Sequence, residues 1–132
     1  MVKTAKRLIA TGKRKTAIAR IQILPGEGKI VINQRPVENY FGRATLHFVI
    51  QHPFEVTGTV GKFDVTANLQ GGGPSGQATS LQHAISKGLL AMNADYRKPL
   101  KTAGLLTRDS RIVERKKYGR HKARRGNQWT KR

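Results

Sequence analysis

The chain contains no cysteine among its 132 residues. This absence excludes a disulfide framework and a thiolate metal site. Acidic residues are also scarce, with 7 Asp and Glu against 26 Lys and Arg. No two acids form an inward-facing pair, and no spacing of Ser, His and Asp suggests a nucleophile beside its base. The sequence therefore predicts no active site and no enzymatic function.

Long apolar runs are missing as well. Residues 1–10 carry charges but have no apolar run long enough for a signal peptide. Nothing in the sequence approaches the length of a membrane span. We therefore expect a soluble, intracellular protein. The length suits one domain, and 37% hydrophobic residues are enough for a modest core.

The four histidines are scattered along the chain, at positions 47, 52, 83 and 121. A zinc site needs three or four converging ligands. Pro53 also keeps His52 and Glu55 from sharing one helix face. We therefore expect no metal and no other cofactor.

Positive charge is abundant and accumulates at the end of the chain. Residues 111–132 hold ten basic side chains and one acid, which is +9 of the formal net charge of +19. With so few aliphatic side chains, this segment cannot offset the entropy of ordering itself unless a polyanion neutralises it. The rings of Tyr118, His121 and Trp129 lie among the cations, where nucleobases can stack. We predict a nucleic-acid-binding tail; the alternative is a solvated, unstructured one.

Residues 1–110 keep the remaining charge of +10 and most of the apolar periodicity. The strands at 16–24 and 29–33 are expected to form a hairpin around the turn at 25–28. The full set of expected strands is 8–10, 16–24, 29–33, 54–56 and 62–69, with a short one at 105–106 in an otherwise loop-like segment.

Apolar residues at helical spacing predict two helices. The first runs through Leu46, Val49 and Ile50 and stops at Pro53, after a short helical turn at 38–41. The second follows a glycine loop, is capped by Ser75 and ends near Asn93. One further turn of helix is expected between 95 and 108. The predicted fold class is α+β, a small sheet packed against two helices.

The glycine loop at 71–76 follows a strand and opens a helix, in the order of a nucleotide-binding phosphate loop. The residues after Gly76 are Gln77 and Ala78, where that motif needs a lysine and a hydroxyl. What remains is free backbone N–H groups at a helix start, which suit a backbone phosphate. The alternative is a loop that only turns the chain.

A basic cluster precedes the second expected strand. Lys13, Arg14 and Lys15, with Arg20, would lie at a sheet edge, where long side chains reach phosphates along a nucleic-acid backbone. The alternative is an edge strand protected from aggregation by its cations.

Together these stretches resemble the family of the ninth protein of the small ribosomal subunit, in its bacterial or organellar form. The matching sequences include Gly-Lys-Arg-Lys-Thr-Ala-Ile-Ala-Arg at 12–20 and Glu-Arg-Lys-Lys-Tyr-Gly at 114–119. Further matches, in the order of the family, lie at 25–28, 38–41, 71–73, 76–77, 99–101, 106–109, 122–124 and 131–132. The resemblance covers essentially the whole chain.

The resemblance implies a fold like the second domain of the fifth small-subunit ribosomal protein, with a left-handed βαβ crossover, which handedness rules alone would not predict. It implies a globular RNA-binding domain at 1–110 and an extended basic tail at 111–132. It also implies a structural role in the head of the small subunit. The expected partners are ribosomal RNA, neighbouring ribosomal proteins of the head, and tRNA at the peptidyl site.

The candidate contacts fall into two sets. The expected ribosomal RNA contacts are Lys13, Arg14, Lys15, Arg20, Gly71, Gly72, Gly73, Gly76, Arg111, Arg115, Lys116, Lys117, Tyr118, Arg120, Lys122, Arg124 and Arg125. The expected tRNA contacts are Trp129, Thr130, Lys131 and Arg132.

Two other functions suit a small cationic chain. The protein subunit of ribonuclease P resembles the same fold class, but its Arg-Asn-rich helix is absent here. A DNA-bending architectural protein would need an apolar wedge for the minor groove and usually a dimer surface, and the sequence shows neither.

Overall fold

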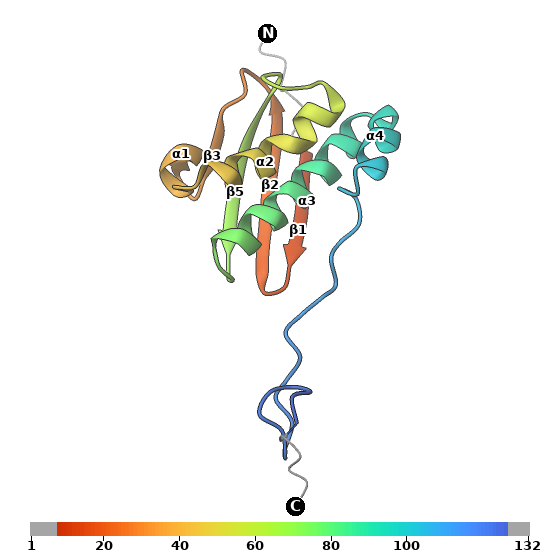
Figure 1. Cartoon of the computed structure of the whole chain (residues 1–132). Coiled ribbons are helices and arrows are strands. Elements are labelled where there is room, and N and C mark those ends of the chain that lie inside the picture. Colours follow the sequence, from red (N-terminus) through yellow and green to blue (C-terminus); the bar gives the residue numbers. More distant parts are fainter. Residues whose placement is uncertain (1–7, 127–132) are drawn as a thin grey trace, which may run out of the picture.

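Strict alternation of apolar and polar side chains along two strands places the core on one face of a sheet. The computed structural model describes residues 8–126. Its five-stranded sheet has the order β1-β2-β5-β3-β4, so β5 lies between β2 and β3 (Figure 1). The strands are β1 (Leu8–Arg14), β2 (Ala17–Pro25), β3 (Ile30–Ile32), β4 (Arg35–Pro36) and β5 (Phe63–Gln70).

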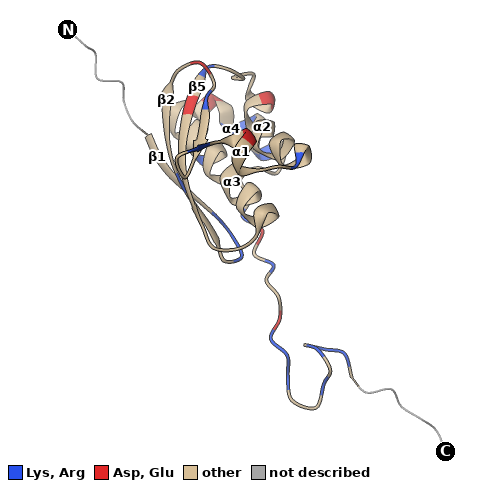
Figure 2. Ribbon diagram, turned by 90° about the vertical axis from the view of Figure 1, so that its left-hand side faces the viewer, with Lys and Arg blue, Asp and Glu red and all other residues tan. Residues whose placement is uncertain are grey.

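The inward face of the sheet is apolar and is covered by helices. The helices are α1 (Val37–Tyr40), α2 (Ala44–Thr57), α3 (Pro74–Met92), a 3-10 turn η1 (Ala94–Tyr96) and α4 (Arg97–Thr102). In β5, Val65, Ala67 and Leu69 are buried and Phe63 is half-buried, as the sequence predicted. Helices α2 and α3 lie on this face, and no helix within residues 8–126 covers the other face of the sheet (Figure 2). The α+β prediction, with a sheet against helices, is confirmed.

The predicted hairpin of residues 16–24 with 29–33 is wrong. Strand β2 pairs antiparallel with β1 and β5, whereas β3 pairs parallel with β5 and antiparallel with β4. The connection after β2 is held by Asp64, whose carboxylate accepts the backbone N–H groups of Glu27, Gly28 and Lys29 at 2.9–3.0 Å. The hairpin forms instead between β1 and β2, through a turn in which Lys15 has a φ of 53°.

The predicted strand at 54–56 is also wrong, because α2 continues through Pro53 to Thr57. A proline removes the N–H that would bond the carbonyl four residues earlier, here that of Val49. The Gln82 side chain of α3 donates to that carbonyl at 3.0 Å and replaces the missing bond. Phe54 can therefore stay helical and is buried in the core.

Helix α3 packs directly on the sheet. Ala78, Leu81, Ile85 and Leu89 are fully buried, and the helix ends at Met92 with Asn93 as its C-cap, as the predicted end near Asn93 required. The predicted cap is wrong: Gly73 holds the N-cap position, Pro74 is the first helical residue, and no side chain caps the helix. Ser75 lies one residue further inside the first turn.

The segment after α3 contains the expected helical turn, extended over η1 and α4. The predicted strand at 105–106 is wrong. Leu105 is buried without strand pairing, and its N–H bonds the Leu100 carbonyl at 3.0 Å. From residue 105 to 126 the chain has neither helix nor strand, and it leaves the domain as an extended segment (Figure 1). Within the part of the chain that the structure describes, no helix is both long and apolar enough to cross a bilayer.

Candidate nucleic-acid interface

Two stretches that are far apart in sequence, the β1–β2 turn and the glycine loop, pack against each other. The backbone of Gly71 passes so close that a Cβ there would lie 2.4 Å from the Thr16 carbonyl oxygen. Gly71 and Gly72 both adopt positive φ values, 72° and 66°, which side chains other than glycine rarely adopt. Both glycines are therefore required for the loop to reach the turn.

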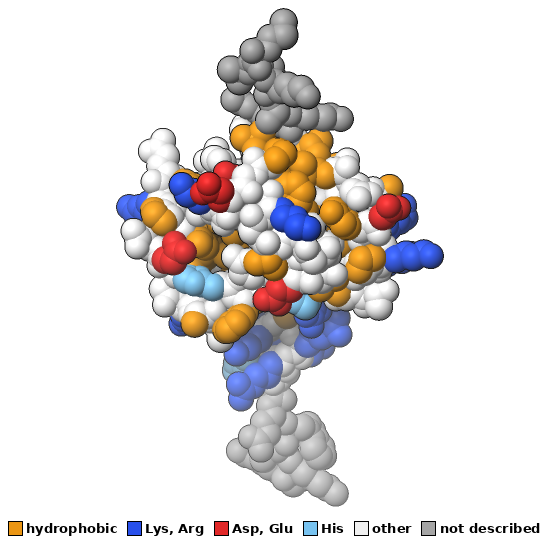
Figure 3. Space-filling model, turned by 90° about the horizontal axis from the view of Figure 1, so that it is seen from above, with side chains coloured by type: hydrophobic (Ala, Val, Ile, Leu, Met, Phe, Trp, Pro, Cys, Tyr) orange, Lys and Arg blue, Asp and Glu red, His pale blue; other side chains and the backbone are white. Residues whose placement is uncertain are grey.

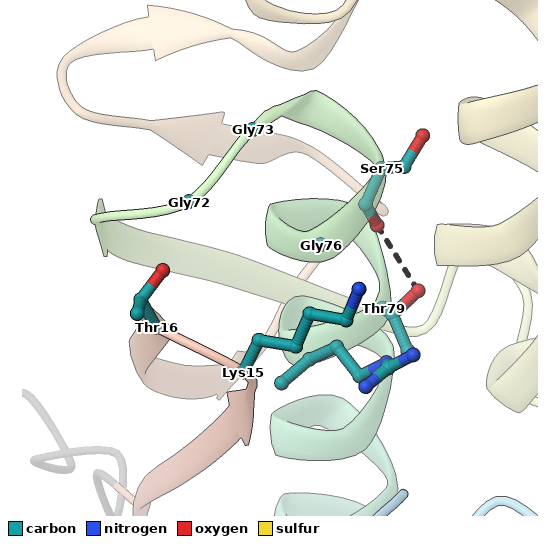
Figure 4. Close-up of a pocket in the computed structure, with 8 residues that line it drawn as sticks. Lys15, Thr16, Gly72, Gly73, Ser75, Gly76 and Thr79 are labelled. Carbon is teal, nitrogen blue, oxygen red and sulfur yellow. Dashed lines mark hydrogen bonds between the residues drawn. The ribbon is translucent and has the colours of Figure 1, made fainter. Parts of the chain in front are cut away.

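A cavity of about 280 Å³ opens where the turn and the loop meet (Figure 4). Its walls come from both stretches and from the first turns of α3. They are formed by Arg14, Lys15, Thr16, Gly72, Gly73, Ser75, Gly76 and Thr79. The loop is held open because Gln77 donates to the Gly71 carbonyl at 3.0 Å, and Tyr40 donates to Gln77 at 2.8 Å.

The chemistry of this cavity suits an anion. Helix α3 begins at its wall with no side-chain cap, so first-turn N–H groups lack an intrahelical acceptor. Lys15 is exposed and adds a full positive charge beside the same turn (Figure 4). Donors and a cation together can hold a phosphate oxygen.

The predicted basic cluster does not form a single patch. Side chains alternate along a strand, so Lys13 and Arg14 point to opposite faces of the sheet. The register of β1 with β2 puts Lys13 beside Ile18 and Thr11 beside Arg20. Lys13 and Arg20 are both exposed, on the face without helices. Lys15 lines the cavity, and Arg14 lies on the helix side.

Arg14 is largely buried and is ion-paired within the protein. Its side chain is 16% exposed and lies 3.3 Å from the Asp109 carboxylate. The same arginine donates to the Arg111 carbonyl at 2.7 Å. Arg111 also pairs with Asp109, at 2.8 Å, and these bonds hold the pKa of the Asp109 carboxyl well below its usual range. Sequence reasoning missed Asp109. The scarcity of acids in this chain was a signal that could have pointed to it.

A buried polar group, His83 on α3, was also missed. Its Nε2 lies 3.3 Å from the Leu106 carbonyl, while its Nδ1 has no hydrogen-bond partner. Burial lowers the pKa of His83 and favours the neutral ring. Across residues 8–126, no three His, Asp or Glu side chains gather in a way that could hold a metal ion.

The described part of the tail is exposed and folds back on itself. Glu114 pairs with Lys117 and, at 2.8 Å, with Arg124. The His121 N–H bonds the Arg125 carbonyl at 2.9 Å, which closes a loop. Tyr118 is 98% exposed. The remaining predicted tail contacts, Arg115, Lys116, Arg120 and Lys122, are all exposed.

The basic elements lie on the same side of the fold. The β1–β2 turn, the β5–α3 loop and the tail lie toward one end of the molecule (Figures 1 and 2). Seen from the opposite end, acidic, basic and apolar side chains are mixed (Figure 3). The predicted tRNA contacts Trp129, Thr130, Lys131 and Arg132 lie outside the described residues.

Comparison with known proteins identifies the family of the chain. Residues 12–132 match the family model described as ribosomal protein S9/S16. The chain is also 55% identical over 127 residues to the small ribosomal subunit protein uS9 of Syntrophobacter fumaroxidans, covering 96% of this chain and 98% of that protein. The chain therefore belongs to the ribosomal protein S9/S16 family.

Proposed function

We propose that this protein is a structural constituent of the small ribosomal subunit, that it binds ribosomal RNA, and that its tail reaches tRNA at the peptidyl site. The observation that carries the proposal is that the turn and the glycine loop lie at one end of the domain and that the tail extends beyond the same end. Membership of a ribosomal protein family makes the chain a structural protein and not an enzyme.

The domain contributes fixed contacts to this interface. Lys15 and the N–H groups of Gly73 and Gly76 would hold one phosphate at the cavity, while Lys13 and Arg20 would reach phosphates beside the open sheet face. Gly71 and Gly72 shape the loop. Such contacts position RNA and do not read its sequence. Arg14 would support the interface from within the protein and would not contact a phosphate itself, because its guanidinium is engaged with Asp109.

The tail contributes most of the charge. Its cations would neutralise phosphates, and the exposed Tyr118 ring offers a stacking surface for a base. The members of this set are Arg111, Arg115, Lys116, Lys117, Arg120, Lys122, Arg124 and Arg125. Beyond the neutral residues 126–128, Trp129 would pack on RNA while Lys131 and Arg132 would meet phosphates of the tRNA anticodon stem-loop. The six residue steps from Arg125 to Lys131 span up to roughly 20 Å when extended, enough to reach a second RNA.

Family resemblance supplies the finer features of the proposal. The parallel strands β3 and β5, joined through α2, form the βαβ unit for which a left-handed crossover is expected. We place the domain boundary near residue 110, the binding site in the subunit head, and the protein in cytoplasmic ribosomes, an organellar ribosome being the alternative.

The first experiment follows the protein in a density gradient of cell lysate. Co-migration with small subunits is expected, because a structural constituent stays bound during sedimentation. Co-migration with ribonuclease P activity or with chromosomal DNA would contradict the proposal and support one of the two alternative functions.

The tRNA contact is tested separately, by filter binding of tRNA to small subunits at matched salt. Subunits carrying a protein that lacks residues 130–132 should bind tRNA modestly more weakly, since two exposed cations are a small part of a large interface. Equal affinities and equal salt dependence would refute the tRNA role and leave the scaffold role intact.

A further inference from the structure

The segment that joins the domain to the tail is attached to the domain at three successive points. Leu105 is 7% exposed and belongs to the hydrophobic core. The Leu106 carbonyl lies 3.3 Å from Nε2 of the buried His83. Asp109 and Arg111 then meet Arg14, the last residue of β1. This segment therefore follows a fixed path along the domain up to residue 111.

The third attachment is the most specific. Both Oδ atoms of Asp109 accept from the Arg111 guanidinium, at 2.8–3.2 Å, and Oδ1 also accepts the Arg111 backbone N–H at 3.0 Å. Arg14 binds Asp109 with one terminal nitrogen and the Arg111 carbonyl with the other. The side chain and both backbone polar groups of Arg111 are thus held at once.

Contact with the domain ends at this point. Ile112 is 70% exposed and Val113 is 82% exposed. In the described part of the chain, the hydrogen bonds of residues 112–126 join tail residues only to each other. The Asp109, Arg14 and Arg111 group, which we call the ionic clamp, is therefore the last contact that determines where the tail begins.

We propose that the ionic clamp positions the tail relative to the β1–β2 turn, so that one RNA surface can meet both. The proposal rests on the RNA-binding function proposed above. Arg14 directly precedes Lys15, which lines the cavity, so the clamp ties the base of the tail to the residue that leads into the turn. A fixed base raises the effective concentration of the tail near the RNA that the turn holds.

Simple electrostatics gives the opposite expectation. Replacing Asp109 by Asn removes a negative charge from an RNA-binding surface and frees two arginines, so RNA affinity should rise. If the clamp positions the tail, Asp109→Asn should instead lower the affinity, because the freed tail base samples many directions. The sign of the change in RNA affinity therefore distinguishes the electrostatic expectation from the positioning role.

The test measures equilibrium binding of full-length small-subunit ribosomal RNA to the whole protein at several salt concentrations. We expect Asp109→Asn to weaken binding by roughly threefold to tenfold. Asp95→Asn is the matched control, since Asp95 is exposed on η1, loses the same charge and makes no ion pair within residues 8–126. It should leave the affinity unchanged or slightly higher.

A second variant covers the case in which Asp109→Asn unfolds the protein, as judged by its circular dichroism. Arg14→Lys keeps the charge, but a single ammonium group cannot reproduce the forked contact with Asp109 and Arg111. It should also weaken RNA binding. Neither substitution should weaken binding further when Lys116, Lys117, Arg124 and Arg125 are alanine, because the tail then has little affinity to position.

Unchanged or tighter RNA binding by a folded Asp109→Asn protein overturns the positioning role. If that protein does not fold, unchanged binding by Arg14→Lys overturns it. Failure of the proposed function looks different, because the wild-type protein would then bind ribosomal RNA no more tightly than a neutral protein at any salt concentration.

Discussion

The globular body and the tail carry almost the same net charge but organise it differently. Residues 1–110 hold +10 and residues 111–132 hold +9. In the described chain, every residue of the hydrophobic core lies between Ala17 and Leu105, whereas Ala123 alone is half-buried among residues 112–126. The body fixes a few cations at strand ends and turns. The tail concentrates many cations on a backbone without helix or strand.

Because of this difference, the two regions suit different parts of RNA binding. A packed body can place a cation and an N–H donor with fixed geometry, as at the cavity beside Gly76. A charge-dense tail neutralises many phosphates, and its folding energy must come from the RNA it binds. Substitutions in the body should therefore change mainly the stability of the fold, and substitutions in the tail should change mainly the RNA affinity.

The largest expected effect comes from the tail. Replacing Lys116, Lys117, Arg124 and Arg125 by Ala should flatten the slope of log affinity against log salt by about three, and lower affinity by about a thousandfold at 0.1 M salt. The control replaces Lys29 and Lys62 by Ala; these are exposed cations of the body, near the end of β2. An unchanged slope in the tail variant would show that the body neutralises the phosphates.

The next effect is on stability and comes from the core. Leu81 is fully buried, so Leu81→Ala should lower the free energy of unfolding by about 2–5 kcal/mol. Chemical denaturation measures it. The salt dependence of RNA binding should not change while the protein is folded, and a changed slope would mean that the two regions are not separable.

A smaller effect tests the glycine loop, which joins β5 to α3 and packs against the β1–β2 turn. Gly71→Ala should cost about 1–3 kcal/mol of unfolding free energy, because of its positive φ and its contact with the Thr16 carbonyl. Gly73→Ala is the matched control, since a Cβ there meets nothing within 4 Å. Equal stability of the two variants would show that the loop can leave the turn without cost.

The smallest effect is a pH dependence confined to the body. The backbone N–H of Lys29, then those of Gly28 and Glu27, lower the pKa of Asp64. A lowered pKa stabilises the fold above the unfolded pKa of about 4, and this contribution is lost as the pH falls through the folded value. The stability difference between wild type and Asp64→Asn should therefore shrink below about pH 4. A constant difference in thermal unfolding from pH 3 to pH 7 would contradict this.

Local patterns in the sequence correctly predicted those elements in which the spacing of apolar residues marks the buried face. The alternation in β5 and the apolar spacing in α3 are of this kind. Two of the errors arose where a residue distant in the sequence determines the local structure. The connection after β2 depends on Asp64, and the continuation of α2 past Pro53 depends on Gln82. Nothing in the sequence of either segment indicates the distant residue that stabilises it.

The same distinction applies to the candidate site. Charge density predicted the tail cations, and the glycine pattern predicted a loop at a helix start. The sequence could not show that Lys15 and Gly72 would share one cavity, or that Arg14 would face Asp109 instead of solvent. Those relationships depend on how β1 and α3 lie against each other.

The position of β5 in the middle of the sheet has a consequence for how the protein is made. Synthesis proceeds from the amino terminus, so β1 to β4 emerge before the strand that joins β2 to β3. The β1–β2 hairpin can form as soon as it emerges, because its contacts are local. Strand β3 has only the two-residue β4 beside it until residues 63–70 appear. The nascent chain thus holds an unfinished sheet that lacks its central strand, and the strand edges that will pair with β5 stay exposed during this interval.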